Sequence, residues 1–117
     1  MNKEEMKRRT KLFALRVIRL VESLPKGRAS EVLGRQLLRS GTSVGANYRA
    51  ACRAKSRADF ISKMGTVEEE ADESMYWIEL LVESGLVLHD DVADLLDEAN
   101  QLVAIPVSSI KTARSNK

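Results

Sequence analysis

A row of arginines is the part of this sequence whose residue types and spacing could do chemistry. At helical spacing, five arginines fall on one side of the segment from 28 to 53, and two cations after it continue the positive charge. The set is Arg28, Arg35, Arg39, Arg49, Arg53, Lys55 and Arg57. An array of guanidinium groups matches phosphate oxygens and releases counterions on binding. Because such contacts reach the nucleic-acid backbone, we expect any binding through them to be independent of base sequence.

The charge of the chain is divided between its two halves. Residues 1–63 hold 16 Lys and Arg against 5 Asp and Glu, whereas residues 64–117 hold 3 against 12, for a net charge of +2. This division has two interpretations. The basic half could form a phosphate-binding face, or the two halves could neutralise each other within the fold or between subunits.

Catalytic groups are scarce. His89 is the only histidine and Cys52 the only cysteine, so no Ser/His/Asp or Cys/His arrangement stands out. The carboxylates of residues 68–73 could suggest a metal site, but a ferritin-like di-iron centre needs two Glu-x-x-His pairs. We therefore predict no catalytic residue, no metal site and no cofactor. We interpret the carboxylates as arginine partners or a solvated face, and His89 as a surface or capping residue in a loop.

Three glycines occupy one flank of the arginine-bearing segment. Gly34, Gly41 and Gly45 fall beside its apolar stripe. Each glycine inside a helix costs about 1 kcal/mol relative to alanine, which suggests a compensating gain from close backbone approach to another helix. The alternative, a phosphate-cradling loop, requires G-x-x-x-x-G-K-[ST], and "GTSVGANYR" has no lysine after its second glycine. We favour packing.

The elements that must position these residues are helices. Apolar residues recur every three or four positions and predict helices at about 3–23, 29–54, 57–84 and 91–113. Pro25 and Gly27 end the first, Ser56 with Asp59 resembles a capping box, and Pro106 kinks the last helix or ends it near Ile105. Short connections between four helices favour a single domain over residues 1–117. We predict an all-α, antiparallel up-down-up-down four-helix bundle.

The third predicted helix is apolar on more than one face. In "MYWIELLV", residues 75–82, Trp77 and Val82 fall on opposite flanks of the core stripe. A helix of this kind needs a second partner, so we expect a homo-oligomer. In the alternative, the first and fourth helices cover both flanks.

Composition bears on the cellular environment. The single Cys52 fits a reducing compartment, the charged start has no apolar signal-peptide core, and no stretch approaches about 18 apolar residues. We expect a soluble cytoplasmic protein with no membrane partner.

Three stretches carry a resemblance to a known family. These are "RSGTSVGANYRAA", "SRADFISKM" and "EADESMYWIELL", within residues 24–87. The chain resembles the bacterial four-helix-bundle proteins encoded in 23S rRNA intervening sequences. The resemblance implies antiparallel bundles that assemble as pentamers. A related branch is the accessory variability protein of diversity-generating retroelements, a basic pentameric barrel that binds the reverse transcriptase and nucleic acid.

The resemblance assigns a structural part to the motif in the second helix. The residues that match it are Arg39, Ser40, Thr42, Ser43, Gly45, Ala46 and Asn47, and those in the third helix are Ser56, Arg57, Phe60, Glu70 and Glu73. Two hypotheses follow. The chain is a non-enzymatic oligomeric adaptor for RNA, DNA or a reverse transcriptase, or it is a structural assembly whose arginines are consumed by salt bridges.

Overall fold

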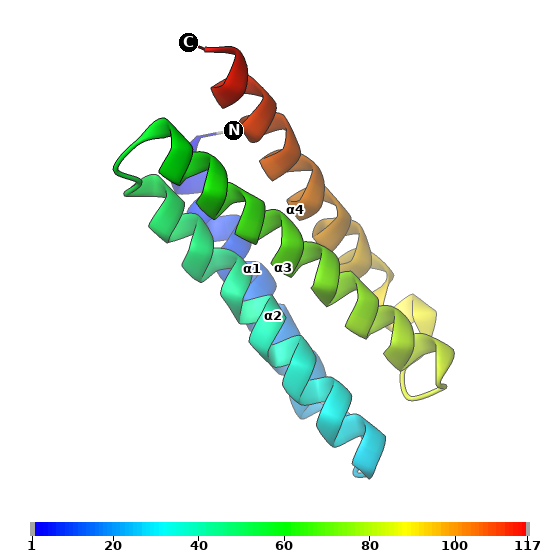
Figure 1. The fold of residues 1–117 in the computed structure, drawn as a ribbon. Coiled ribbons are helices and arrows are strands. Elements are labelled where there is room, and N and C mark those ends of the chain that lie inside the picture. The colour runs from blue at the N-terminus through cyan, green and yellow to red at the C-terminus, as the bar shows by residue number, and fades with distance from the viewer. Residues whose placement is uncertain (1, 117) are drawn as a thin grey trace.

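The protein is a bundle of four helices, seen in a computed structural model that describes residues 2–116. The helices are α1 (Lys3–Glu22), α2 (Arg28–Cys52), α3 (Arg57–Glu83) and α4 (His89–Ser115), and the described residues contain no strand. They form an elongated body of 50 × 21 × 20 Å. Both chain ends and the α2–α3 connection lie at one end of this body, and the other two connections lie at the opposite end (Figure 1). The predicted all-α antiparallel bundle is confirmed.

Local signals fix most of the helix ends. The Asn2 side chain accepts the Glu5 N–H at 2.8 Å and caps α1. Ser56 accepts the Asp59 N–H at 3.0 Å, while the Asp59 carboxylate reaches back to the Lys55 N–H, one residue before the cap. Gly85 follows α3 with φ 82°, a left-handed conformation that suits glycine. The predicted cap of the third helix is therefore present, and a glycine follows the end of the same helix.

The limits of two helices, the second and the fourth, differ by two residues from those expected. The second helix ends at Cys52 rather than at about 54, because the Arg53 and Ala54 N–H groups bond three residues back in a tighter turn. The fourth begins at His89, so this histidine lies in the helix rather than in the preceding loop.

Pro106 lies within α4 and is buried there. The helix continues past it to Ser115, so the alternative that the helix ends near Ile105 is wrong. Proline has no N–H to donate to the carbonyl four residues earlier. The helix α4 therefore continues through Pro106 without that one hydrogen bond.

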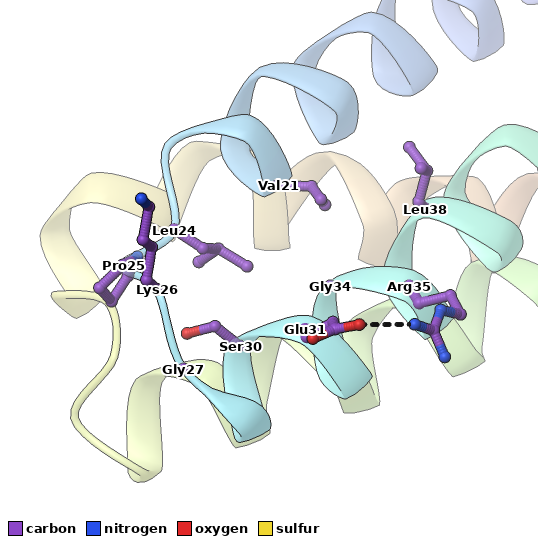
Figure 2. Close-up of a pocket in the computed structure, with 10 residues that line it drawn as sticks. All are labelled: Val21, Leu24, Pro25, Lys26, Gly27, Ser30, Glu31, Gly34, Arg35 and Leu38. Carbon is purple, nitrogen blue, oxygen red and sulfur yellow. Dashed lines mark hydrogen bonds and ion pairs between the residues drawn. The ribbon is translucent and has the colours of Figure 1, made fainter.

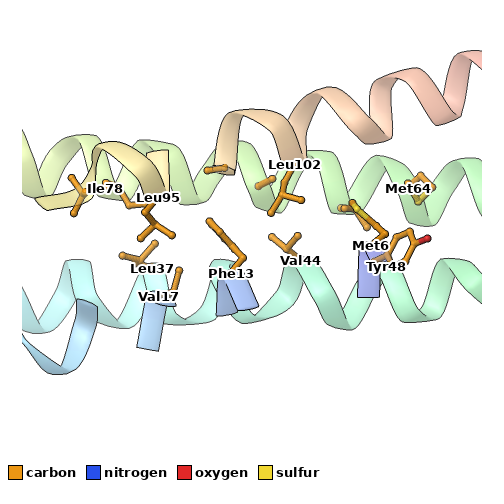
Figure 3. Close-up of a cluster of buried hydrophobic side chains, with 14 of the residues drawn as sticks. Met6, Phe13, Val17, Leu37, Val44, Tyr48, Met64, Ile78, Leu95 and Leu102 are labelled. Carbon is orange, nitrogen blue, oxygen red and sulfur yellow. The ribbon is translucent and has the colours of Figure 1, made fainter. Parts of the chain in front are cut away.

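The core is the inner side of all four helices (Figure 3). Phe13 and Val17 of α1 meet Leu37 and Val44 of α2, with Ile78 and Leu102 opposite, and all of these side chains are fully buried. Burial of each such side chain contributes about 1.5 to 3 kcal/mol.

One polar contact lies inside this core, between α2 and α3. The hydroxyls of Ser40 and Ser74 are 2.9 Å apart, and Ser74 also donates to the Glu70 carbonyl at 2.8 Å. Both side chains are buried and both are hydrogen-bonded, so the contact ties the two helices together without an unsatisfied group.

Candidate nucleic-acid interface

The three glycines of α2 lie where this helix contacts α1. A Cβ at position 41 would lie 2.8 Å from both Cγ atoms of Val17, and one at position 45 would lie 3.1 Å from the Thr10 hydroxyl oxygen. At position 34 the nearest atom would be a Leu24 methyl at 3.2 Å. The helices approach so closely because glycine leaves no side chain between them. Since α2 is continuous through this stretch, it holds no phosphate-cradling loop.

The predicted arginine row divides into residues with and without acidic partners. Arg39 turns toward α3, where it forms ion pairs with Glu70, at 3.1 Å, and with Glu73. Arg35 pairs with Glu31 on its own helix at 3.0 Å. The other five cations of the set form no ion pair within residues 2–116: Arg28, Arg49, Arg53, Lys55 and Arg57.

Four of these five cations lie in the same half of the bundle as the chain ends. We call residues 2–11, 46–67 and 100–116 the terminal half, and residues 12–45 and 68–99 the connector half. The terminal half holds 12 Lys and Arg against 3 Asp and Glu, and the connector half holds 6 against 14. The net charge, which differs between the two halves of the sequence, therefore also differs between the two ends of the bundle.

A groove between α1 and α2 has its cations in the terminal half and extends a short way into the connector half. It has a volume of about 460 Å³, with Ala14, Thr42, Gly45 and Ala46 among its lining residues. The charged residues that line it are Glu4, Lys7, Arg8, Lys11 and Arg49. Lys7 approaches the exposed Glu4 at 3.6 Å, which is a weak surface pair. Arg8, Lys11 and Arg49 form no ion pair in the described part of the chain.

A second hollow, at the other end of the same two helices, has a different character (Figure 2). It measures about 610 Å³, is lined by Val21, Leu24 and Leu38 among others, and its Arg35 is held by Glu31. The Ser30 hydroxyl beside this hollow is buried and has no hydrogen-bond partner within residues 2–116. The groove in the terminal half is therefore the better candidate for anions.

One arginine bridges the seam between α1 and α4. Arg9 donates to both carboxylate oxygens of Glu98, at 3.0 and 2.6 Å, and to Gln101 at 2.9 Å. The hydrogen bond to Glu98 raises the pKa of Arg9, against the opposing effect of burial. This ion pair makes Arg9 part of the scaffold rather than of the free basic surface.

Trp77 and Val82, predicted as oligomer or helix-packing residues, are both partly buried against the core. The Trp77 ring nitrogen donates to Glu73 at 3.1 Å. The helices packed against α3 are α2 and α4, so the alternative in which the first and fourth helices cover both of its flanks is wrong.

Tyr76, next to Trp77, is exposed, but most of the large exposed apolar side chains lie outside α3. Leu12, Leu15 and Ile18 of α1 are 52%, 45% and 37% exposed, and Leu38 of α2 is 37% exposed. The sequence analysis did not identify these residues. The available signal was that all three α1 residues are apolar but fall outside the core stripe of that helix.

Other chemistry finds little support within residues 2–116. No group of three or more His, Cys, Asp or Glu side chains there could hold a metal ion. Burial raises the pKa of Tyr48 beside Cys52, so the phenol stays neutral at physiological pH. None of the described helices has both the length and the apolar character needed to cross a bilayer.

Comparisons with known proteins point in one direction. Residues 2–108 match the model of the 23S rRNA-intervening sequence protein family. The fold is similar to the crystal structure of a protein of unknown function from the S23 ribosomal protein family of Bacteroides thetaiotaomicron. The two share 35% sequence identity with a TM-score of 0.87, over 95% of this chain and 99% of the other. No curated protein matches the sequence.

Proposed function

Since the chain belongs to the 23S rRNA-intervening sequence protein family, and the similar solved protein has no known function, we propose a role for it from its surface. The protein is a non-enzymatic, homo-oligomeric helical adaptor. It binds nucleic acid, or a nucleic-acid enzyme such as a reverse transcriptase, through the basic surface of α1 and α2.

The observation that carries this proposal is the set of unpaired cations in the terminal half. Arg49, Arg53, Lys55 and Arg57 form no ion pair in the described chain, and only 3 acidic residues share their half of the bundle. The basic and acidic residues are separated along a body 50 Å long. This separation matters because charges more than about 8 Å apart are largely screened from each other at physiological salt. A phosphate backbone at the terminal half would therefore meet a positive field despite a net charge of only +2.

The exposed apolar residues of α1 support the oligomeric part of the proposal. Leu12, Leu15 and Ile18 expose large side chains on a small domain, and such surfaces mark interaction sites. We propose that copies of the chain associate as a closed ring, with a pentamer as the expected assembly.

Binding to mixed RNA and DNA, measured near 150 mM salt and over a salt series, tests the proposal. We expect a dissociation constant below about 100 μM and a log-log salt slope of about −0.7 to −0.9 per phosphate neutralised. The double variant Arg53→Glu, Arg57→Glu should lose most of the binding. A matched variant of the connector half, Arg19→Glu, Lys26→Glu, should retain it.

Light scattering on the same samples tests the assembly, and a monomer mass at micromolar concentration would contradict it. Wild-type binding weaker than about 100 μM would remove the nucleic-acid role.

A structural assembly without nucleic-acid binding is the second candidate. The ion pairs of Arg39 with Glu70 and Glu73, and of Arg9 with Glu98, show that some arginines are consumed between helices. This candidate predicts the expected oligomer mass together with no salt-dependent binding.

A further inference from the structure

The α1–α2 groove of the terminal half combines a low floor with two cationic walls. Gly45 and Ala46 of α2 and Ala14 of α1 present little or no side chain, while Lys7 and Lys11 line it from α1 and Arg49 from α2. The close packing of Gly45 on Thr10 brings the two cationic helices together. The feature that permits helix packing therefore also shapes the groove.

The aromatic residues say which form of nucleic acid this groove suits. Single-strand binders stack bases on exposed aromatic rings, at about 1 to 3 kcal/mol per base. Here Phe13 and Tyr48 are buried, and Phe60 is partly buried against the core. The exposed rings within residues 2–116, Tyr76 and His89, are both in the connector half. The terminal half can contact phosphates but has no exposed ring on which to stack a base.

We propose that this groove holds the sugar-phosphate backbone of a nucleic-acid duplex, with Lys7, Lys11 and Arg49 as the phosphate contacts. The inference rests on the proposed nucleic-acid role and adds to it a location and a preference for paired over single strands. In a duplex the bases are already stacked, so the lack of aromatic platforms costs nothing. The contacts carry no base-reading code.

The test compares Lys11→Gln, Arg49→Gln with a matched control, Arg19→Gln, Lys26→Gln. Each pair removes two exposed cations, and the two pairs lie at opposite ends of the bundle. Binding of hairpin duplexes and of unstructured single strands of equal length is measured by fluorescence anisotropy over a salt series. Circular dichroism and light scattering establish that fold and mass are unchanged.

We expect the wild type to bind duplex more tightly than single strand. The groove variant should bind duplex with a log-log salt slope smaller in magnitude by about 2, one unit for each phosphate that the variant no longer neutralises. The control should keep the wild-type slope. Tighter binding of single strands would overturn the preference for duplex. Equal slopes for the groove variant and the control would overturn the location. Either result leaves the nucleic-acid role intact. A wild type that binds neither form would overturn both.

Discussion

The two seams of α1 are built by opposite means. Toward α2, Gly34, Gly41 and Gly45 let the helix backbones approach until Val17 and Thr10 occupy the space of absent side chains. Toward α4, contact is sparse, and Arg9 reaches across to Glu98 and Gln101. One seam depends on shape and the other on a half-buried charge pair. Substitutions in the two seams should therefore destabilise the bundle for different reasons.

Gly41→Leu should break the first seam and have the largest effect. A leucine there collides with Val17, whose methyl carbons would lie only 2.8 Å from the new Cβ. Overpacking typically costs about 1 to 3 kcal/mol, and a site this tight belongs at the upper end. Urea unfolding should show a lower midpoint with an unchanged slope. An unchanged midpoint would mean that α1 moves aside freely and that the seam is loose.

Glu98→Ala should break the second seam by a smaller amount. It leaves Arg9 without its two-point partner, and hydrogen bonds to charged groups contribute about 1.5 to 3 kcal/mol. Because Arg9 and Glu98 remain 24% and 18% exposed, water compensates in part, and we expect a loss of about 1 to 2 kcal/mol. Asp94→Ala, an exposed site on the same helix, is the control. Equal losses for the two variants would remove the assigned role of the pair.

Gly65→Ala sharpens the comparison, and its effect should be the smallest and of opposite sign. No atom lies within 4 Å of the position that a Cβ would take at this glycine of α3. Without a close neighbour, alanine gains about 0.5 to 1 kcal/mol through helix propensity and a less flexible unfolded chain. A raised unfolding midpoint is the expected result. A lowered midpoint would show that the absence of a side chain at this position also serves helix packing.

The sequence predicted the helices because their signals are local. Ser56 with Asp59, Gly85 and the apolar period fix each element through contacts a few residues apart. The same period alone could not show whether α4 would tolerate Pro106, since its apolar pattern continues on both sides of the proline. Nor could it place His89 inside α4, where no side chain caps the first turn.

The candidate site was less predictable, because ion pairing depends on which helices become neighbours. Arg39 and Arg49 are both exposed residues of the predicted row. Arg39 meets two carboxylates of α3, whereas Arg49 faces the α1–α2 groove and meets none in the described chain. Helical spacing placed both on the outer side of α2, but only the packed bundle distinguishes a consumed arginine from an available one.

The sparse contact between α1 and α4 has a kinetic consequence. Every extensive contact joins helices that follow each other in sequence: α1 with α2, α2 with α3, and α3 with α4. The chain can therefore fold as three overlapping helical hairpins, each closing only a short connection. Proteins rich in such local contacts fold in microseconds to milliseconds. The contact between the first and last helices, through Arg9 and Glu98, is sparse, so each hairpin can pack without waiting for it.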